Sequence, residues 1–371
     1  MLGATNTIGL TGNTFLDATI VVVGISAGLT LLLQVANKLF CDYGECEITI
    51  NKEKKITVEG GCSLLDALYA NKIFIPSACG GQGTCGFCKV RVLDGGGQTL
   101  PTELPYLEPN EVTNGTRLAC QVKVKNAMEL KVREDFLNVQ EFTGVITKAE
   151  MKTEDTREIH IQLKEPAEMK YRPGQYVQIN VPHPKERVSR AYSICSQSSR
   201  KNEVELLIRL IPGGLGSTYM HEVQVGDEIS LTGPYGEFEL DTEAELVCIG
   251  GGCGMAPMRS ILRWIAEENP EQKCWLFFGA RTPKDAMYYD EFTELAKSMP
   301  NFKVVYAMSD PENSPGWDGE TGFIHLAVDK HISEEGNKQA FLCGPPMMID
   351  AASKVLKTKN LTDDRIFYDE F

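Results

Sequence analysis

The stretch Ser77-Ala-Cys-Gly-Gly-Gln-Gly-Thr-Cys-Gly-Phe-Cys88 decides the fold of its surroundings, because it gathers three cysteines in one glycine-rich loop. These cysteines follow a C-x5-C-x2-C spacing, and Cys120 comes after 31 further residues. Such a set is typical of the ligands of one [2Fe-2S] cluster. The four interspersed glycines supply positive φ angles and N–H groups that can point at sulfur. The sequence therefore predicts a cluster bound by Cys79, Cys85, Cys88 and Cys120.

A zinc site and disulfide bonds are the alternatives for these cysteines. Zinc prefers C-x2-C pairs on two short hairpins and does not require a glycine-rich run. Twelve cysteines in 371 residues could indicate a secreted protein. However, the chain is far larger than a disulfide-dense module, so a reducing cytoplasmic environment fits better.

The composition limits the remaining possibilities. A chain of 371 residues has room for two or three domains, and 42% hydrophobic with 24% charged residues is ordinary for folded protein. The net charge of −14 argues against nucleic acid as a partner and leaves no basic patch for anionic lipid.

Residues 1–40 differ from the rest and predict a membrane anchor helix. Ala18 to Ala36 contains no charged residue, and as a helix it would span about 29 Å, close to the thickness of a bilayer. A buried core helix and a signal peptide are the alternatives, but no Lys or Arg precedes the apolar run, as a signal peptide requires. The first Lys is Lys38, so the positive-inside rule places the large C-terminal part in the cytoplasm.

Three soluble domains are expected after the anchor. Residues 41–134 predict a small α+β domain around the cluster, from strands at 47–51, 55–59 and 88–93, a helix at 63–70 and a strand-forming tail at 117–132. Residues 135–242 predict an antiparallel β-barrel, because short strands recur at 141–147, 157–163 and 176–181 between Gly-containing turns. Residues 243–371 alternate buried strands with helices, which indicates an α/β doubly wound sheet.

Two motifs of the predicted barrel suit a nucleotide cofactor. Arg190-Ala-Tyr-Ser193 could place a guanidinium on a pyrophosphate and an aromatic ring against a flavin; its other interpretation is a surface strand. The loop Pro212-Gly-Gly-Leu-Gly-Ser-Thr218 offers free N–H groups and two hydroxyls to a phosphate; its other interpretation is a plain turn.

Two further motifs belong to the predicted α/β domain. Gly250-Gly-Gly-Cys-Gly-Met-Ala-Pro257 follows a strand and opens a helix, which is the context of a nucleotide-phosphate loop. Cys343, in Cys343-Gly-Pro-Pro-Met-Met348, ends a later strand, where ligands of a doubly wound sheet bind. A nicotinamide is expected beside it, although a lone Cys is usually a small buried hydrophobe.

In this order and spacing, the four motifs resemble those of the ferredoxin–NADP⁺ reductase superfamily over residues 139–371. The resemblance implies that Arg190 contacts the FAD pyrophosphate, that Tyr192 stacks on the isoalloxazine and that Ser193 lies near its N5. It also implies catalytic contributions from Ser193, Cys343 and a terminal aromatic, Phe371, that covers the flavin. The residues that match its phosphate and nicotinamide loops are Gly214, Ser217 and Thr218 for FAD, and Gly251, Gly252, Gly254 and Pro257 for the pyridine nucleotide.

The whole chain, helix included, resembles the F subunits of the sodium-translocating NADH:quinone oxidoreductases, through motifs such as Leu100-Pro-Thr-Glu-Leu104 and Thr321-Gly-Phe-Ile-His325. Two departures stand out. The stretch from Asn180 to Arg190 is short where familiar members carry a long insertion. Cys41 and Cys46 add a C-x4-C pair, which predicts free thiols or a metal shared with a partner.

This resemblance implies a membrane-anchored enzyme of the bacterial inner membrane, working with other integral membrane subunits and reducing quinone indirectly. NADH donates two electrons and a cluster accepts one, so FAD is expected between them. Arg281 could bind a 2′-phosphate, but similar NADH-using members also carry an Arg there, so NADH is the expected substrate. The alternatives are a reductase that supplies an oxygenase and a membrane-tethered electron-transfer or redox-sensing module.

Overall fold

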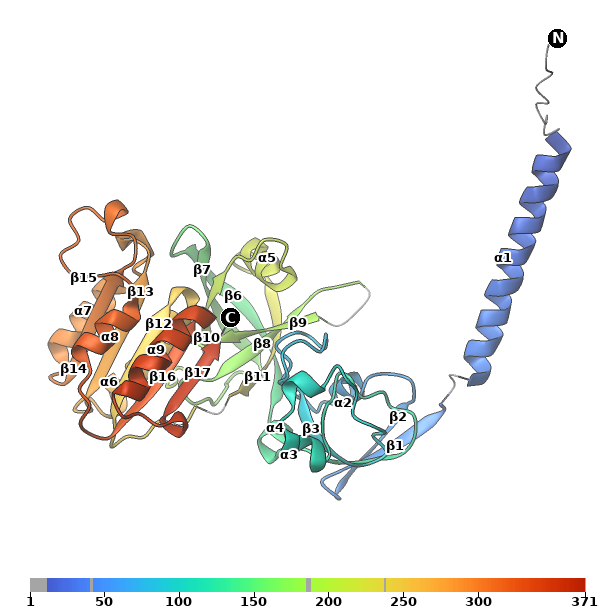
Figure 1. Cartoon of the computed structure of the whole chain (residues 1–371), viewed down its shortest axis with the longest axis horizontal. Helices are drawn as coiled ribbons and strands as arrows, with labels where there is room; N and C mark the ends of the chain where they lie inside the picture. Colours follow the sequence, from blue (N-terminus) through green and yellow to red (C-terminus); the bar gives the residue numbers. More distant parts are fainter. Residues whose placement is uncertain (1–11, 41–42, 185–187, 237, 371) are drawn as a thin grey trace, which may run out of the picture. The chain divides into compact units, whose positions relative to one another are not determined.

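A computed structural model describes residues 12–40, 43–184, 188–236 and 238–370. The contacts between residues divide the chain into two compact units (Figure 1). The first contains residues 1–67 and 89–132, and the second contains residues 68–88 and 133–371. The segment that carries Cys79, Cys85 and Cys88 is thus counted with the second unit.

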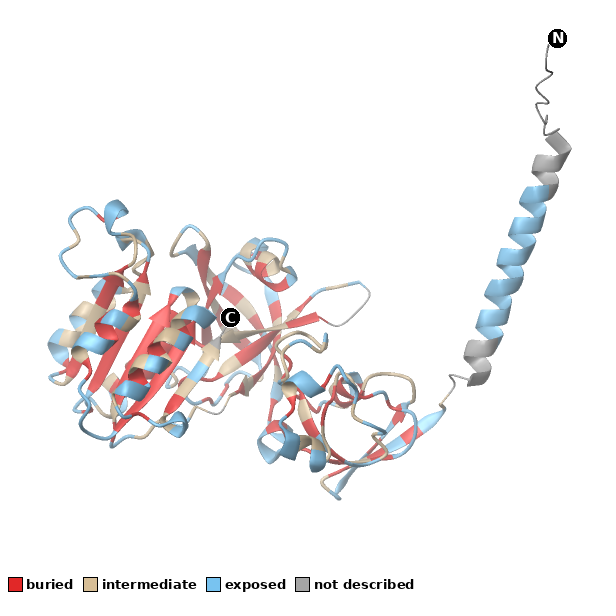
Figure 2. Ribbon diagram, viewed as in Figure 1, coloured by how far each residue is buried: buried red, intermediate tan, exposed pale blue. Residues whose placement is uncertain are grey.

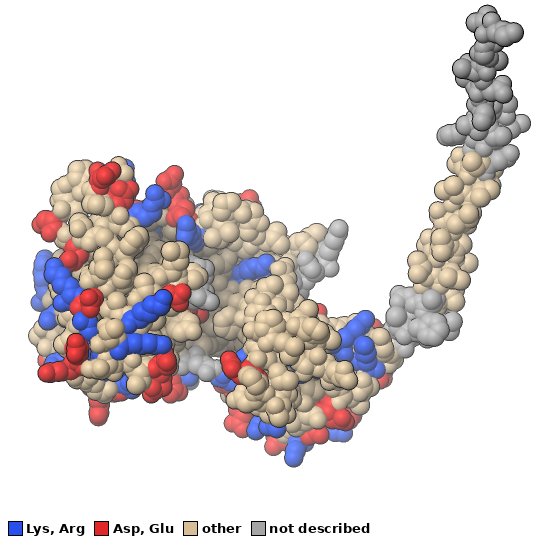
Figure 3. All heavy atoms as spheres, viewed as in Figure 1, with Lys and Arg blue, Asp and Glu red and all other residues tan. Residues whose placement is uncertain are grey.

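The predicted anchor is a single helix, α1 (Gly12–Phe40). Its stretch Ala18–Val35 is long and apolar enough to cross a bilayer, and none of it is buried against the rest of the chain (Figure 2). This stretch also lacks Lys, Arg, Asp and Glu, so its surface in Figure 3 is uncharged. A core helix of a soluble protein would be mostly buried, so the exposure of this stretch favours a membrane anchor.

The first unit contains a five-stranded sheet in the order β2-β1-β5-β3-β4. The predicted hairpin is confirmed: β1 and β2 pair antiparallel, with Ile48 opposite Ile56. Alternate side chains such as Ile48 and Ile50 are fully buried, as expected for strands with one face on a core. The strands are β1 (Glu45–Ile50), β2 (Lys54–Glu59), β3 (Lys89–Asp94), β4 (Thr116–Leu118) and β5 (Met128–Lys131).

Short helices connect these strands. The predicted helix is α2 (Leu64–Ala70), and its cap forms as expected: the Asp66 N–H donates to Ser63 Oγ at 3.1 Å. The turn η1 (Leu104–Tyr106) and the helix α3 (Pro109–Thr113) lie between β3 and β4. The helix α4 (Glu134–Leu137) already belongs to the second unit.

The second unit begins with the six-stranded antiparallel sheet β10-β7-β6-β11-β8-β9. A bridge between Ile194, next to the end of β9, and Leu206 of β10 joins its two edges, so the predicted barrel is confirmed. Its elements are β6 (Gln140–Met151), β7 (Thr156–Glu165), β8 (Tyr176–Val181), β9 (Val188–Ser193), β10 (Glu203–Arg209), α5 (Leu215–Glu222) and β11 (Glu228–Tyr235).

The rest of the unit, called here the α/β lobe (residues 243–370), is the predicted doubly wound sheet. All its paired strands are parallel, in the order β15-β14-β13-β12-β16-β17. The strands are β12 (Glu245–Gly251), β13 (Cys274–Ala280), β14 (Phe302–Met308), β15 (Glu320–Thr321), β16 (Lys338–Gly344) and β17 (Ile366–Glu370).

Helices cover both faces of this sheet. On β12, Leu246 and Cys248 belong to the hydrophobic cluster with α6 and α7, while Val247 and Ile249 belong to the cluster with α8 and α9. Alternating burial on two faces explains why this strand is almost entirely apolar. The helical segments are η2 (Gly252–Gly254), α6 (Met255–Glu268), η3 (Pro283–Asp285), α7 (Tyr289–Ser298), η4 (Pro311–Asn313), α8 (Ile324–His331), α9 (Pro346–Thr358) and η5 (Asp363–Arg365).

Candidate functional site

The cysteines of the glycine-rich loop offer sulfur ligands to a metal cluster. Cys79 Sγ and Cys85 Sγ lie 3.4 Å apart. The hydrogen bond from Cys85 lowers the pKa of the Cys79 thiol to about 3, while the same interaction raises the pKa of Cys85. Cys88 is buried at the end of the loop, and Cys120 follows β4 in the first unit. No disulfide bond joins any two of the cysteines in the described part of the chain.

The backbone conformation of the loop explains why it contains four glycines. Gly80, Gly81, Gly83 and Gly86 all have positive φ angles, between 67° and 91°. A side chain would strain each of these positions. The buried Ser77 accepts a hydrogen bond from the Gly81 N–H at 2.9 Å, which fixes the start of the loop. The donor set and the loop conformation therefore fit a [2Fe-2S] cluster.

A buried ion pair supports the strand that leads to Cys120. Arg117 Nη2 donates to Glu103 Oε2 at 2.6 Å, and both side chains are almost completely buried. Glu103 also accepts from the Leu118 N–H at 2.9 Å. The pair thus ties the segment before Cys120 to the loop after β3.

We expect Arg117→Met to destabilise the first unit by about 3–5 kcal/mol, because it strands the Glu103 carboxylate in the interior. The urea concentration at which the cluster absorbance disappears measures this loss. Lys55→Met is the control, since Lys55 and Glu47 form an exposed pair worth about 1 kcal/mol or less. Equal midpoints for the two variants would contradict the expectation.

The structure brings the Arg190 strand and the Gly214 loop together. Arg190 and Tyr192 lie half-buried on β9, and α5 begins after Gly214. A Cβ on Gly216 would lie 2.5 Å from Arg190 Cγ and 2.8 Å from the Tyr192 hydroxyl, so only glycine allows this approach. An arginine, a tyrosine and a helix N-terminus at one place suit the pyrophosphate and ring of a flavin nucleotide.

The hydroxyl of Ser217 makes hydrogen bonds within its own loop. It accepts from the Ile211 N–H at 3.0 Å and lies 3.3 Å from the Gly214 carbonyl, so it shapes the loop from inside. Thr218 is half-buried, and its N–H donates to Gly214 O at 3.0 Å. Ser193, at the end of β9, is half-buried and pairs with Tyr176 of β8.

The second glycine loop follows β12 and opens α6 as predicted. Gly252 is exposed at φ +56°, and a Cβ there would meet nothing within 4 Å. Open space beside a strand end and a helix start suits a bound phosphate. A Cβ on Gly251 would lie 2.7 Å from Met348 Sδ, and Pro257 is buried in the first turn of α6.

Gly254 joins this loop to the predicted nicotinamide position. A Cβ on Gly254 would lie 1.9 Å from the Cys343 carbonyl oxygen, so the backbones meet here in direct contact. Cys343 is buried at the end of β16, opposite Asp369 of β17. Burial raises the pKa of the Cys343 thiol well above its usual value, which keeps it protonated.

One other predicted residue, Arg281, lies at the end of a strand of the α/β lobe. Arg281 is exposed directly after β13, and its carbonyl accepts from the Asp310 N–H at 3.0 Å. Phe371 lies outside the described residues, as does Cys41. Cys46 is a buried free thiol, with its Sγ 3.8 Å from the Tyr43 carbonyl.

Sequence reasoning missed a polar network, called here the lobe clamp, between the barrel and the α/β lobe. Arg259 of α6 is buried and donates to Glu205 of β10 at 2.6 Å and to Glu291 of α7 at 3.0 Å. Its guanidinium also lies 4.1 Å from the ring centroid of Tyr288. The clamp comprises Arg259, Arg263, Glu158, Glu205, Tyr288 and Glu291.

Glu158 anchors the barrel side of the lobe clamp. Burial alone would raise its pKa, but hydrogen bonds from His160, Lys148 and Tyr288 hold that pKa well below its usual range. The carboxylate is therefore charged at neutral pH, and the clamp pairs charges across the two parts of the unit.

Three residues beside the clamp could hold a metal by distance alone. The ligand atoms of His160, Glu203 and Glu205 lie within 4.8 Å of one another. However, His160 Nδ1 is 2.9 Å from Glu203 and its Nε2 is 3.1 Å from Glu158, while Glu205 binds Arg259. These side chains already have their partners, so we assign them to the network.

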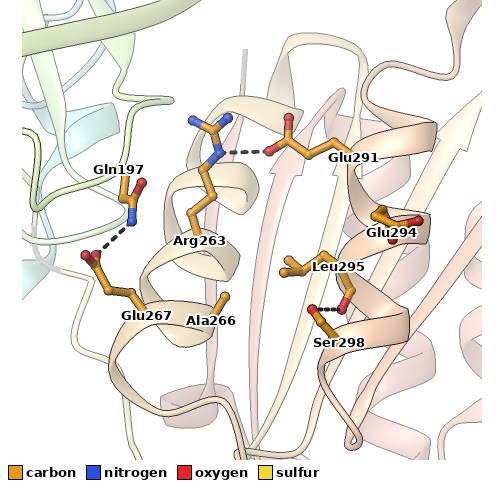
Figure 4. A pocket seen from close by; sticks show the side chains of 8 residues that line it. All are labelled: Gln197, Arg263, Ala266, Glu267, Glu291, Glu294, Leu295 and Ser298. Atoms are coloured by element: carbon orange, nitrogen blue, oxygen red, sulfur yellow. Dashed lines mark hydrogen bonds and ion pairs between the residues drawn. The ribbon is translucent and has the colours of Figure 1, made fainter.

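A shallow hollow of about 670 Å³ lies beside the same network (Figure 4). It is lined by Gln197, Arg263, Ala266, Glu267, Glu291, Glu294, Leu295 and Ser298. Arg263 is paired with Glu291 at 2.8 Å, which leaves a lining rich in carboxylates. Such a lining repels phosphate, and the hollow lies along α6 and α7 away from the glycine loops, so it does not suit a dinucleotide.

Comparison with known protein families agrees with the three-part arrangement. A model of the 2Fe-2S iron-sulfur cluster binding domain matches residues 48–125. The oxidoreductase FAD-binding domain matches residues 143–240, and the oxidoreductase NAD-binding domain matches residues 248–354. The chain therefore has domains for a [2Fe-2S] cluster, FAD and NAD, as predicted.

Several relatives match nearly the whole chain. The F subunit of the Na(+)-translocating NADH-quinone reductase of Neisseria meningitidis serogroup B is 35% identical, and the match covers 92% of this chain and 96% of the relative. The F subunit of Haemophilus ducreyi is 34% identical, with 97% and 99% covered. Its alignment runs over 405 positions, more than the 371 residues here, so that relative has residues that this chain lacks.

Solved structures share the fold. A cytochrome P450 reductase of Amycolatopsis superposes with a TM-score of 0.69 at 29% identity, covering 88% of this chain and 98% of its own. A ferredoxin reductase in carbazole 1,9a-dioxygenase gives a TM-score of 0.66 at 28% identity, with the same coverage.

Proposed function

Because the chain belongs to the family of the F subunit of the Na(+)-translocating NADH-quinone reductase, we propose that it oxidises NADH for a quinone-reducing, Na⁺-translocating membrane complex. That the chain is an oxidoreductase follows from its NAD- and FAD-binding domains. The observation that carries the proposal is the combination of these domains and the cluster domain with a helix long enough to span a membrane.

Bound FAD supplies the conversion of a hydride from NADH into single electrons, which a [2Fe-2S] cluster can carry. We assign the cluster to Cys79, Cys85, Cys88 and Cys120. Arg190 and the N-terminus of α5 hold the FAD phosphates, and Tyr192 and Ser193 orient the flavin ring. The loop of Gly251 and Gly252 binds the NADH phosphates. No residue of the chain has to act as a general acid or base.

The buried Cys343 closes one side of the proposed nicotinamide position. Its neutral thiol adds no charge there, and the buried side chain would help to exclude water from that side of the bound nicotinamide. Arg281 lies where the adenosine end of NADH would extend.

The α1 helix anchors the chain in the inner membrane of a bacterium, with the soluble domains in the cytoplasm. Lys38, at the C-terminal end of the apolar stretch, supports this orientation. The domains that we propose are the anchor (1–40), the cluster domain (41–134), the FAD domain (135–242) and the NAD domain (243–371). Because Ala18–Val35 carries no charge, Na⁺ movement belongs to partner subunits.

A second candidate function is a reductase that supplies an oxygenase. The fold shared with a cytochrome P450 reductase and a dioxygenase ferredoxin reductase favours it. Affinity purification from native membranes in mild detergent separates the two. Recovery with polytopic subunits and quinone-reducing activity supports the proposed function, whereas recovery with an oxygenase contradicts it.

We expect Cys85→Ser to abolish electron output from the cluster while NADH still bleaches the flavin, because the exchange removes a ligand and leaves the FAD and NAD sites intact. Iron content, the cluster EPR signal and flavin absorbance measure the two effects. Cys62→Ser, at a half-buried thiol outside the set, is the control. Loss of flavin bleaching in Cys85→Ser would count against this order of electron flow.

We expect Phe371→Ala to alter the affinity for the nicotinamide nucleotide, because a terminal aromatic that covers the flavin has to move aside for NADH. Steady-state kinetics with NADH and NAD⁺ inhibition test this, with Tyr368→Ala, an exposed aromatic of β17, for comparison. Kinetic constants unchanged from those of the wild type would remove Phe371 from the site.

A further inference from the structure

The side chain of Arg190 reaches the loop of the predicted cluster ligands. Arg190 Nη1 donates to the Cys79 carbonyl oxygen at 3.3 Å and to the Ser189 carbonyl oxygen at 2.8 Å. Arg190 lies on β9 and Cys79 is 111 positions away in the sequence, yet both belong to the second compact unit. A residue of the proposed FAD site therefore touches the backbone of a proposed cluster ligand.

Glycines make this approach possible from both sides. Gly80 has φ +67°, and a Cβ there would lie 2.7 Å from Arg190 Nη1 and 3.1 Å from the Ser189 carbonyl oxygen. Gly216, in the proposed FAD loop, leaves room for the stem of the same arginine, since a Cβ there would lie 2.5 Å from Arg190 Cγ. The arginine is thus held between the cluster loop and the proposed FAD phosphate loop.

The hydrogen bonds leave donors of the guanidinium available. An arginine offers five N–H donors in a planar fork. Among the residues that the structure describes, Arg190 uses only Nη1 in hydrogen bonds to protein. Nε and Nη2 can therefore bind a pyrophosphate while Nη1 stays on the Cys79 carbonyl.

We propose that Arg190 is a positioning residue for the cluster as well as a ligand of FAD, and that its charge at the Cys79 carbonyl raises the reduction potential of the cluster. The inference rests on the proposed function for the assignment of FAD and the cluster. A reduced cluster carries one more negative charge than an oxidised one, so a nearby cation favours the reduced form. The same side chain fixes the loop next to the flavin site.

The test is a redox titration of the cluster in the full-length protein, followed by EPR, with iron and FAD contents measured on each sample. We expect Arg190→Ala to lose FAD and to shift the cluster midpoint potential to a more negative value. Tyr192→Ala is the matched control variant. It should weaken FAD binding but keep the hydrogen bond from Arg190 to the Cys79 carbonyl oxygen, so the cluster midpoint potential should stay unchanged. Equal midpoints in Arg190→Ala and Tyr192→Ala would overturn the proposal.

Two further variants keep the test decisive if Arg190→Ala does not accumulate. Arg190→Lys retains the charge, so its midpoint should stay close to that of the wild type although FAD binds more weakly. Gly80→Ala places a methyl group 2.7 Å from Arg190 Nη1, so the guanidinium has to move off the Cys79 carbonyl, and the midpoint should shift as in Arg190→Ala while FAD remains bound. A wild-type midpoint in Gly80→Ala would contradict the role at the cluster. Full FAD occupancy in Arg190→Ala would instead contradict the assignment of Arg190 to the FAD site. The cluster midpoint of the same variant would still decide its role at the cluster.

Discussion

Arg259→Met is expected to destabilise the α/β lobe by about 3–5 kcal/mol, the usual cost of removing one partner from a buried ion pair. Glu205 is 2% exposed and lies 2.6 Å from Arg259, so its carboxylate would remain charged in the interior without its main cation. Methionine replaces much of the volume of arginine. The loss of unfolding free energy therefore comes mainly from the lost charge and not from a new cavity. The second arginine of the clamp, Arg263, lies 3.2 Å from Glu205 and compensates only in part.

Tryptophan fluorescence measures this loss directly, because all three tryptophans, Trp264, Trp275 and Trp317, lie in the α/β lobe. Arg172→Met is the control, since Arg172 and Glu239 form an exposed pair at 3.4 Å. Adding Glu205→Gln to Arg259→Met should recover part of the stability by removing the stranded charge. Identical urea midpoints for Arg259→Met and the control would contradict the view of the clamp as the main polar contact between barrel and lobe.

Gly254→Ala is expected to lower kcat/KM for NADH about a hundredfold. The added methyl would lie 1.9 Å from the Cys343 carbonyl oxygen and 3.0 Å from the Gly344 nitrogen, so one of the two backbones has to move. The movement separates the proposed phosphate loop from the proposed nicotinamide position, and a displacement of about 1 Å costs about a hundredfold in rate. Stopped-flow measurement of flavin bleaching by NADH gives the effect.

Gly28→Ala provides the control for the added methyl, because a Cβ at this helical position meets nothing within 4 Å. Its NADH kinetics should equal those of the wild type. The cluster EPR signal of Gly254→Ala should also be unchanged, since its cysteines lie in other segments. A normal rate of flavin bleaching in Gly254→Ala would show that the contact with Cys343 does not set the geometry of hydride transfer.

The local features of the fold could be predicted from the sequence. The alternation in Glu47–Asn51 and Lys55–Glu59 predicts the β1–β2 hairpin, and Ser63 predicts the start of α2. The continuous apolar run Leu246–Gly250 predicts a strand buried on both faces. In each case the pattern and its consequence lie within a few residues of each other.

The contacts between distant segments could not be predicted in this way. Gly254 meets Cys343 only because β16 pairs with β12 in the sheet order, which no local pattern specifies. Arg259 follows a glycine motif that predicts nucleotide binding, yet its partners lie on β7, β10 and α7.

Rapid mixing of the full-length protein with NADH, without oxygen, tests most directly whether one chain passes electrons from NADH through FAD to its cluster. Flavin absorbance and freeze-quenched EPR of the cluster follow the reaction in the same preparation. We expect flavin bleaching to come first and the EPR signal of the reduced cluster to appear afterwards. A cluster that is reduced without prior bleaching of the flavin, or that NADH never reduces, would contradict it.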